Sequence, residues 1–163
     1  MEQRTVLIIS EQSTDHLILS ACLQRAVPAR FSLTSHEHLE RPLEALMDPN
    51  IDAVIMAYGP QTDYLLRLAQ KNDAPVPLLV LLDEADEAVI SRLREYGAQD
   101  YLVRGQLQDA LVHRVLDYSI ALKQAREKIR QLSNRDTLTG ALNRVGFRAH
   151  MERAMDRSER YGF

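Results

Sequence analysis

Short apolar runs separated by amphipathic stretches are the feature that most constrains this chain. Runs rich in Val, Ile and Leu occupy residues 5–10, 52–57, 77–82 and 99–103. Their near-continuous hydrophobicity is typical of parallel strands that are covered on both faces. A less apolar segment at residues 29–35 predicts a fifth strand, at the edge of the sheet.

The stretches between these runs predict helices over residues 13–26, 36–47, 62–72 and 86–97. Ser13, Thr62 and either Asp83 or Asp86 are available as N-cap acceptors, and Gly97 is a C-terminal stop. Five β/α units in this order predict an α/β fold: a doubly wound, five-stranded parallel sheet with right-handed crossovers.

Composition narrows the class of protein. A chain of 163 residues is long enough for one core plus an appendage. No apolar run approaches the roughly 20 residues that cross a bilayer, so we expect a soluble, cytoplasmic protein without a membrane partner. Cys22 is the only cysteine, which excludes an internal disulfide and predicts a small core residue.

Charge is distributed unevenly along the chain. Residues 1–105 carry a net charge of −7, from 9 Lys/Arg and 16 Asp/Glu, whereas residues 106–163 carry +4, from 11 and 7. The basic charges are interleaved along a helical pattern and lack aromatic partners, so they favour a solvated helix face over a nucleic-acid site.

In a doubly wound sheet the functional crevice lies at the carboxyl ends of the strands. The five loops expected there contain neither a GxGxxG nor a P-loop motif, which argues against a nucleotide site in this part. His36 and His38 are close in sequence, but they favour two solvated loop residues over metal ligands, so no metal site is predicted.

At this point the sequence resembles a known family. The segments "VLIIS", "IDAVIMAYGP" and "GAQDYLVRG" give residues 5–120 a pattern similar to the receiver domain of bacterial response regulators, which have a flavodoxin-like fold. Receivers carry an acidic pair after the first strand, a phospho-accepting Asp after the third, a Thr or Ser after the fourth, and a Lys after the fifth. The resemblance places these roles, and that of an aromatic residue reporting activation, at Ser10, Glu11, Ala57, Leu82, Arg104 and Tyr101.

Most of these positions have lost the chemistry that the family uses. Ala57 offers no oxygen nucleophile, Leu82 offers no hydroxyl, and Ser10 weakens a site for Mg²⁺. Asp83 is a possible substitute acceptor but is more simply interpreted as a helix cap, and Tyr101 as a packing residue. We therefore predict a pseudo-receiver that phosphotransfer does not switch.

A second pattern begins within the last predicted helix of this domain. Leu111 and six further residues recur at spacings of 4 and 3, which is the 3.5-residue repeat of a coiled coil. The seam that we predict consists of Val115, Tyr118, Leu122, Ala125, Ile129 and Leu132, within a helical linker at residues 111–134. Leu111 and Val115 are also compatible with packing on the helix's own domain. Beyond Leu122 the helix outruns a compact domain, so we expect a parallel homodimer.

The segment "RDTLTGALNR" resembles the "DxLTGLxNR" opening of GGDEF domains, the diguanylate cyclase fold. The matching residues are Asp136, Leu138, Thr139, Gly140, Asn143 and Arg144, while Ala141 departs from the usual Leu. Residues 135–163 would then be the start of a truncated GGDEF domain. The family condenses two GTP molecules into cyclic di-GMP with Mg²⁺, on a turn that this chain lacks. We expect no cofactor and no catalytic residue in this chain, and Mg²⁺ and GTP for its parent protein.

Two functions remain open from the sequence. The first is a phosphorylation-independent regulatory and dimerisation module of a bacterial diguanylate cyclase, or of a degenerate cyclase fused to a phosphodiesterase. The second is a non-catalytic adaptor whose receiver-like face docks on a protein partner. The reading frame downstream of Phe163 would separate the two.

Overall fold

The computed structural model describes residues 3–25, 30–134 and 144–161. The chain divides into two compact units, residues 1–123 and residues 124–163. Among the described residues, no helix is long and apolar enough to cross a membrane.

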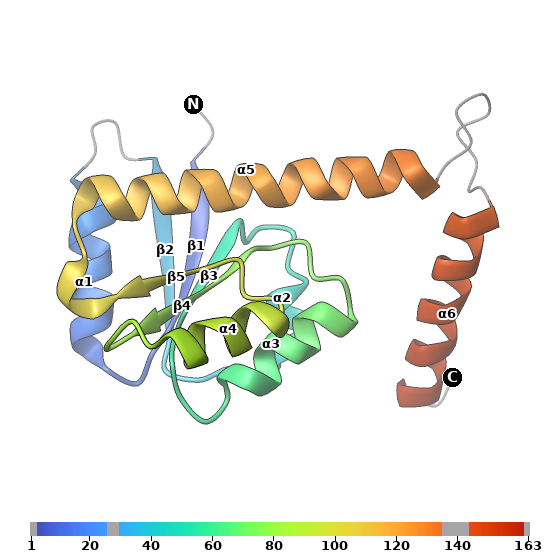
Figure 1. The fold of residues 1–163 in the computed structure, drawn as a ribbon, viewed down its shortest axis with the longest axis horizontal. Helices are drawn as coiled ribbons and strands as arrows, with labels where there is room; N and C mark the ends of the chain where they lie inside the picture. Colours follow the sequence, from blue (N-terminus) through green and yellow to red (C-terminus); the bar gives the residue numbers. More distant parts are fainter. Residues whose placement is uncertain (1–2, 26–29, 135–143, 162–163) are drawn as a thin grey trace. The chain divides into compact units, whose positions relative to one another are not determined.

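A five-stranded parallel sheet forms the centre of the first unit (Figure 1). Its strands are β1 (Arg4–Ile9), β2 (Phe31–His36), β3 (Ala53–Ala57), β4 (Leu78–Leu82) and β5 (Asp100–Val103). Their order across the sheet is β2-β1-β3-β4-β5, and all four neighbouring pairs are parallel. The predicted fold class is confirmed, as is the edge position of the second strand.

Helices cover both faces of this sheet. They are α1 (Ser13–Gln24), α2 (Pro42–Leu46), α3 (Thr62–Lys71), α4 (Glu87–Glu95) and α5 (Asp109–Asn134), with a short 3-10 turn at Arg104–Gln106. Successive side chains of a strand point to opposite faces, so each strand contributes to two cores. One core contains Leu7, Val54 and Val80 beneath α2, α3 and α4, and the other contains Ile8, Ile55 and Leu81 beneath α1 and α5.

Three local predictions need correction. The helix predicted over residues 36–47 is only Pro42–Leu46, because the fixed φ of Pro42 suits the first turn and its missing N–H excludes a helix interior. Neither Ser13 nor Thr62 caps its helix: each is the first helical residue, after Gln12 in α1 and after Gln61 in α3. Asp86 alone caps α4: its carboxylate accepts from the backbone N–H groups of Ala88 and Val89. Gly97 ends α4 with a φ of +96°, as predicted.

The buried stripe of α5 lies one residue away from the position that the sequence favoured. Val112, Leu116 and Ile120 are buried in the core shared with α1, whereas Leu111 and Val115 are only half-buried. Along the predicted seam, Tyr118, Ile129 and Leu132 are each about two-thirds exposed, at 63%, 66% and 66%. These three apolar side chains of the predicted seam are therefore not buried within the units to which they belong.

The second unit contains the end of α5 and helix α6 (Arg144–Tyr161). Three exposed apolar side chains, Phe147, Met151 and Met155, recur every four residues along α6. Of the predicted GGDEF opening motif, only Arg144 lies within the described residues, as the first residue of α6. Asp136, Leu138, Thr139, Gly140 and Asn143 lie outside them.

Candidate functional site

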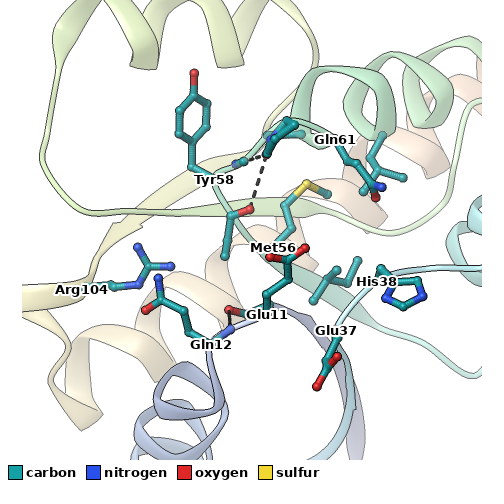
Figure 2. A pocket seen from close by; sticks show the side chains of 15 residues that line it. Glu11, Gln12, Glu37, His38, Met56, Tyr58, Gln61 and Arg104 are labelled. Atoms are coloured by element: carbon teal, nitrogen blue, oxygen red, sulfur yellow. Dashed lines mark hydrogen bonds between the residues drawn. The ribbon is translucent and has the colours of Figure 1, made fainter.

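A pocket opens at the carboxyl edge of the sheet, where the loops after β1, β2 and β3 meet the residue after β5 (Figure 2). Figure 2 shows Arg104 at one side of this pocket and Glu37 and His38 at the other, with Glu11 and Met56 between them. This is the crevice that the topology predicts for a ligand or a reaction.

Ala57 lies in the pocket wall at the end of β3. Its methyl group supplies neither a nucleophile nor a metal ligand. Two backbone groups next to it are satisfied by one side chain. The Thr62 hydroxyl accepts a hydrogen bond from the Gly59 N–H at 2.9 Å and donates one to the Ala57 carbonyl at 3.4 Å. The loop after β3 is thus held without any group beyond the chain's own atoms.

Arg104 is the centre of a polar network at the rim. Its Nε and Nη2 donate to the two carboxylate oxygens of Asp15, at 2.8 and 2.9 Å, in a bidentate pair. Its Nη1 donates to Asp83, at 2.5 Å. Arg104 therefore joins the start of α1 to the loop between β4 and α4, across the end of β5.

Asp15 is the buried anchor of this network, with a side-chain exposure of 2%. It also accepts from the Ser10 hydroxyl at 2.5 Å, and that oxygen in turn accepts from the Gln12 N–H at 3.1 Å. A buried carboxylate is stable only when its lone pairs are met by donors. Here three side-chain donors from two residues meet that need.

The pKa values follow from these contacts. Burial opposes ionisation of the Asp15 carboxyl, but hydrogen bonds from Arg104 and Ser10, together with the charges of Arg104 and His16, outweigh it and lower the pKa of Asp15. The hydrogen bond to Asp15 raises the pKa of Arg104 further above its usual range. Both groups are therefore charged at neutral pH, and the network is an ion pair.

The structure brings four of the six predicted pocket residues together and separates the other two from them. Ser10, Glu11, Ala57 and Arg104 all line the pocket. Leu82 is buried within the core beneath α4, and Tyr101 packs half-buried against that core. The apolar part of the pocket lining comes instead from residues such as Ile9, Met56 and Leu65.

Asp15 was not singled out from the sequence, although a signal was present. It lies on the same helical face as Leu19, Cys22 and Leu23, all buried, so extending that face by one turn brings a carboxylate into the interior. The interpretation of Asp83 as a helix cap is wrong, since it pairs with Arg104 and Asp86 takes the capping role. Cys22 is buried, as predicted.

The polar side chains around the pocket do not form a recognisable metal site among the described residues. Within the described ranges, no group of three or more His, Cys, Asp and Glu side chains is placed to hold a metal ion. His36 ends β2 and His38 follows it in the loop. The acidic group that lies deepest, Asp15, is already neutralised by Arg104. The hydrogen bonds and ion pairs of Asp15 and Arg104 instead connect the loops that follow β1, β4 and β5.

No protein-family model matches the chain. Comparison with individual curated proteins, however, finds similarity to response regulators. The two-component response regulator ORR11 of rice (Oryza sativa subsp. indica) is 30% identical over 105 residues, which cover 61% of this chain and 69% of that protein. The protein of the same name from Oryza sativa subsp. japonica gives the same values.

Solved structures with the same architecture include several receivers. A response regulator from Thermotoga maritima superposes with a TM-score of 0.62 at 22% identity, covering 74% of this chain and 99% of that one. An orphan response regulator of H. pylori superposes with a TM-score of 0.55 at 27% identity, covering 69% and 92%.

Proposed function

Because this chain belongs to the two-component response regulators and has their receiver fold, we propose that it is a receiver whose output is independent of phosphorylation and which acts as a regulatory and dimerisation module. The single observation that carries this proposal is Ala57 in the wall of the pocket at the end of β3. Phosphoryl transfer to a receiver needs an oxygen nucleophile there, together with oxygen ligands for Mg²⁺.

The surroundings of Ala57 support the same conclusion. Arg104, which lines the same pocket, is engaged by Asp15 and Asp83, so it is not available to a transferred phosphoryl group without breaking an ion pair. Leu82 contributes only apolar packing where the family has a hydroxyl. The losses at Ser10, Ala57 and Leu82, at the ends of three different strands, all act against phosphotransfer.

The test is incubation of the chain with acetyl phosphate and Mg²⁺, followed by intact-mass measurement. We expect no gain of a phosphoryl group. Ala57→Asp is the informative companion variant, because it restores the nucleophile alone. It should be labelled weakly at most, since Ser10 and Leu82 still deny the pocket a second carboxylate and a hydroxyl. Stoichiometric labelling of the wild type would contradict the proposal.

Dimerisation is supported by α5. Tyr118, Ile129 and Leu132 are exposed along a seam with coiled-coil spacing, and a water-exposed apolar stripe of this kind is stabilised by a second copy of the same helix. In the proposed arrangement two chains associate in parallel through the exposed residues of the α5 seam, while Val112, Leu116 and Ile120 stay packed on the sheet. The receiver would then influence whatever follows it by changing helix register or orientation.

We further propose that the output belongs to a diguanylate cyclase. This step rests on the sequence resemblance of "RDTLTGALNR" to the start of GGDEF domains. The test is the reading frame downstream of Phe163, together with the activity of its full product. An intact Gly-Gly-Asp/Glu-Glu-Phe turn, and cyclic di-GMP formed from GTP and Mg²⁺, would support the proposal. An early stop would contradict it and favour the adaptor function. Residues 1–163 alone should form no product.

A further inference from the structure

Two polar ties connect α4 and the loop before it to other parts of the domain. In the first tie, Asp83 in the loop before α4 pairs with Arg104 after β5 at 2.5 Å. In the second tie, Arg92 of α4 donates to the Tyr58 hydroxyl and lies 3.8 Å from the Asp63 carboxylate. Tyr58 follows β3 and Asp63 lies in the first turn of α3, so this second tie reaches a different part of the sheet edge.

We propose that these two ties hold α4 and the loop before it in one position, so that the conformation of this element is set by the chain's own charges. The inference deepens the proposed function and rests on it, because a receiver that phosphorylation does not switch keeps α4 where its own side-chain contacts hold it. Asp83 and Tyr58 are the residues that close the two ties.

The geometry explains why the Asp83 pair forms although Asp83 is exposed. Isolated exposed pairs contribute little, because two long side chains must be ordered against water. Arg104 is already ordered, since its side chain is 19% exposed and two of its nitrogens are fixed by buried Asp15. Asp83, at 81% exposure, therefore meets a preorganised donor. Asp15 acts as the positioning residue for this tie.

In the second tie the arginine is likewise held by more than one contact. Arg92, Asp63 and Tyr58 are each about 40% exposed, and Arg92 is shared between an ion pair and a phenolic hydroxyl. Below it, Ile90 and Leu93 fix α4 in the core, so the orientation of Arg92 follows from the packing of its own helix. The first tie thus acts on the loop before α4, and the second acts on the helix itself.

Amide hydrogen exchange of residues 84–92, measured by NMR, tests the proposal. Asp83→Asn removes the charge that closes the first tie, and Tyr58→Phe removes the hydrogen bond of the second tie while leaving the Arg92–Asp63 pair in place. Neither substitution removes appreciable volume. Each should speed exchange in this segment by about two- to fivefold, the range that a surface pair contributes. Glu84→Gln and Tyr64→Phe are matched controls, since they make the same chemical change at exposed neighbouring positions, and they should leave exchange unchanged. In 1 M NaCl the wild type should approach Asp83→Asn, because salt screens the exposed pair.

Three outcomes would overturn the proposal: Asp83→Asn exchanging like Glu84→Gln, Tyr58→Phe exchanging like Tyr64→Phe, or both variants speeding exchange equally across the whole sheet. The last would mark these residues as contributors to global stability alone, which urea unfolding measures independently. The outcome for the proposed function is separate. Labelling of the wild type by acetyl phosphate would contradict phosphorylation independence, whatever the exchange rates show.

Discussion

Asp15 and Arg104 face each other through two parallel hydrogen bonds, of 2.8 and 2.9 Å, between residues 89 positions apart in the sequence. Planar guanidinium and carboxylate groups match in this geometry, which makes the pair both directional and charge-assisted. Because the Asp15 carboxylate is buried, the pair cannot exchange its partner for water without exposing or orphaning a charge. The loops at the carboxyl edge of the sheet are organised around it.

Replacing Asp15 by Asn should lower the free energy of unfolding by roughly 1.5–3 kcal/mol, the contribution of hydrogen bonds to charged groups. The amide keeps the shape but loses the charge that Arg104 requires. Urea unfolding, followed by circular dichroism, measures the difference. Asp83→Asn is the control at the exposed end of the same network, and it should cost at most about 1 kcal/mol. Equal losses in both variants would show that burial of Asp15 does not govern the network.

The contribution of Asp15 should depend on pH with a definite sign. Its pKa is lower in the folded chain than in the unfolded chain, where it is about 3.9, so unfolding takes up a proton between the two values. The stability difference between wild type and Asp15→Asn should therefore be full at neutral pH and shrink as the pH falls below about 4. A difference that stays constant down to pH 2 would contradict the ion-pair assignment.

Helix α5 should separate into a part that stabilises the domain and a part that does not. Leu116 is fully buried, so Leu116→Ala should cost about 2–5 kcal/mol through lost packing and a cavity. Leu132 is 66% exposed, so Leu132→Ala should change the unfolding free energy of the first unit by less than about 0.5 kcal/mol. Both variants are measured at concentrations at which the chain is monomeric. A large loss from Leu132→Ala would show that this part of the helix is packed in the monomer.

Self-association should depend on the α5 seam. Each buried Leu or Ile contributes roughly 1.5–3 kcal/mol, so a few layers can sustain a weak, concentration-dependent dimer. Leu122→Asp or Ile129→Asp places like charges in an apolar layer and should give a monomer. Ala121→Asp adds the same charge on an exposed position outside the seam and should leave the dimer intact. Sedimentation velocity at tens of micromolar distinguishes these results. A monomeric wild type, or dimeric seam variants, would exclude α5 as the interface.

The sheet and its strand boundaries could be predicted from the sequence because buried parallel strands leave a local signal. Each inner strand must be apolar on both faces, as Val54 and Ile55 illustrate by entering opposite cores. Gly97 was predictable for a similar reason, since few residues other than glycine adopt its positive φ at a helix end.

The polar network could not be predicted in the same way. Asp15, Asp83 and Arg104 belong to three separate elements, and nothing in their own neighbourhoods records that they meet. Asp83 was wrongly interpreted as a helix cap because the sequence does not show at which residue α4 begins. Asp83 and Asp86 are equally plausible caps until the first helical residue is known to be Glu87. The shift from Leu111 to Val112 on α5 has a related cause: a 3.5-residue seam and a 3.6-residue surface stripe differ little over two turns.

Beryllofluoride binding, followed by two-dimensional NMR of the labelled chain, shows whether the pocket can accept a phosphoryl group at all. Beryllofluoride with Mg²⁺ mimics the phosphorylated aspartate of a receiver. If Ala57 and the Asp15–Arg104 pair exclude phosphoryl chemistry, the amide signals of the loops after β1, β3 and β4 should not move when it is added. Mg²⁺-dependent, saturable shifts at Ala57, Asp83 and Arg104 would instead mean that phosphorylation still switches this receiver.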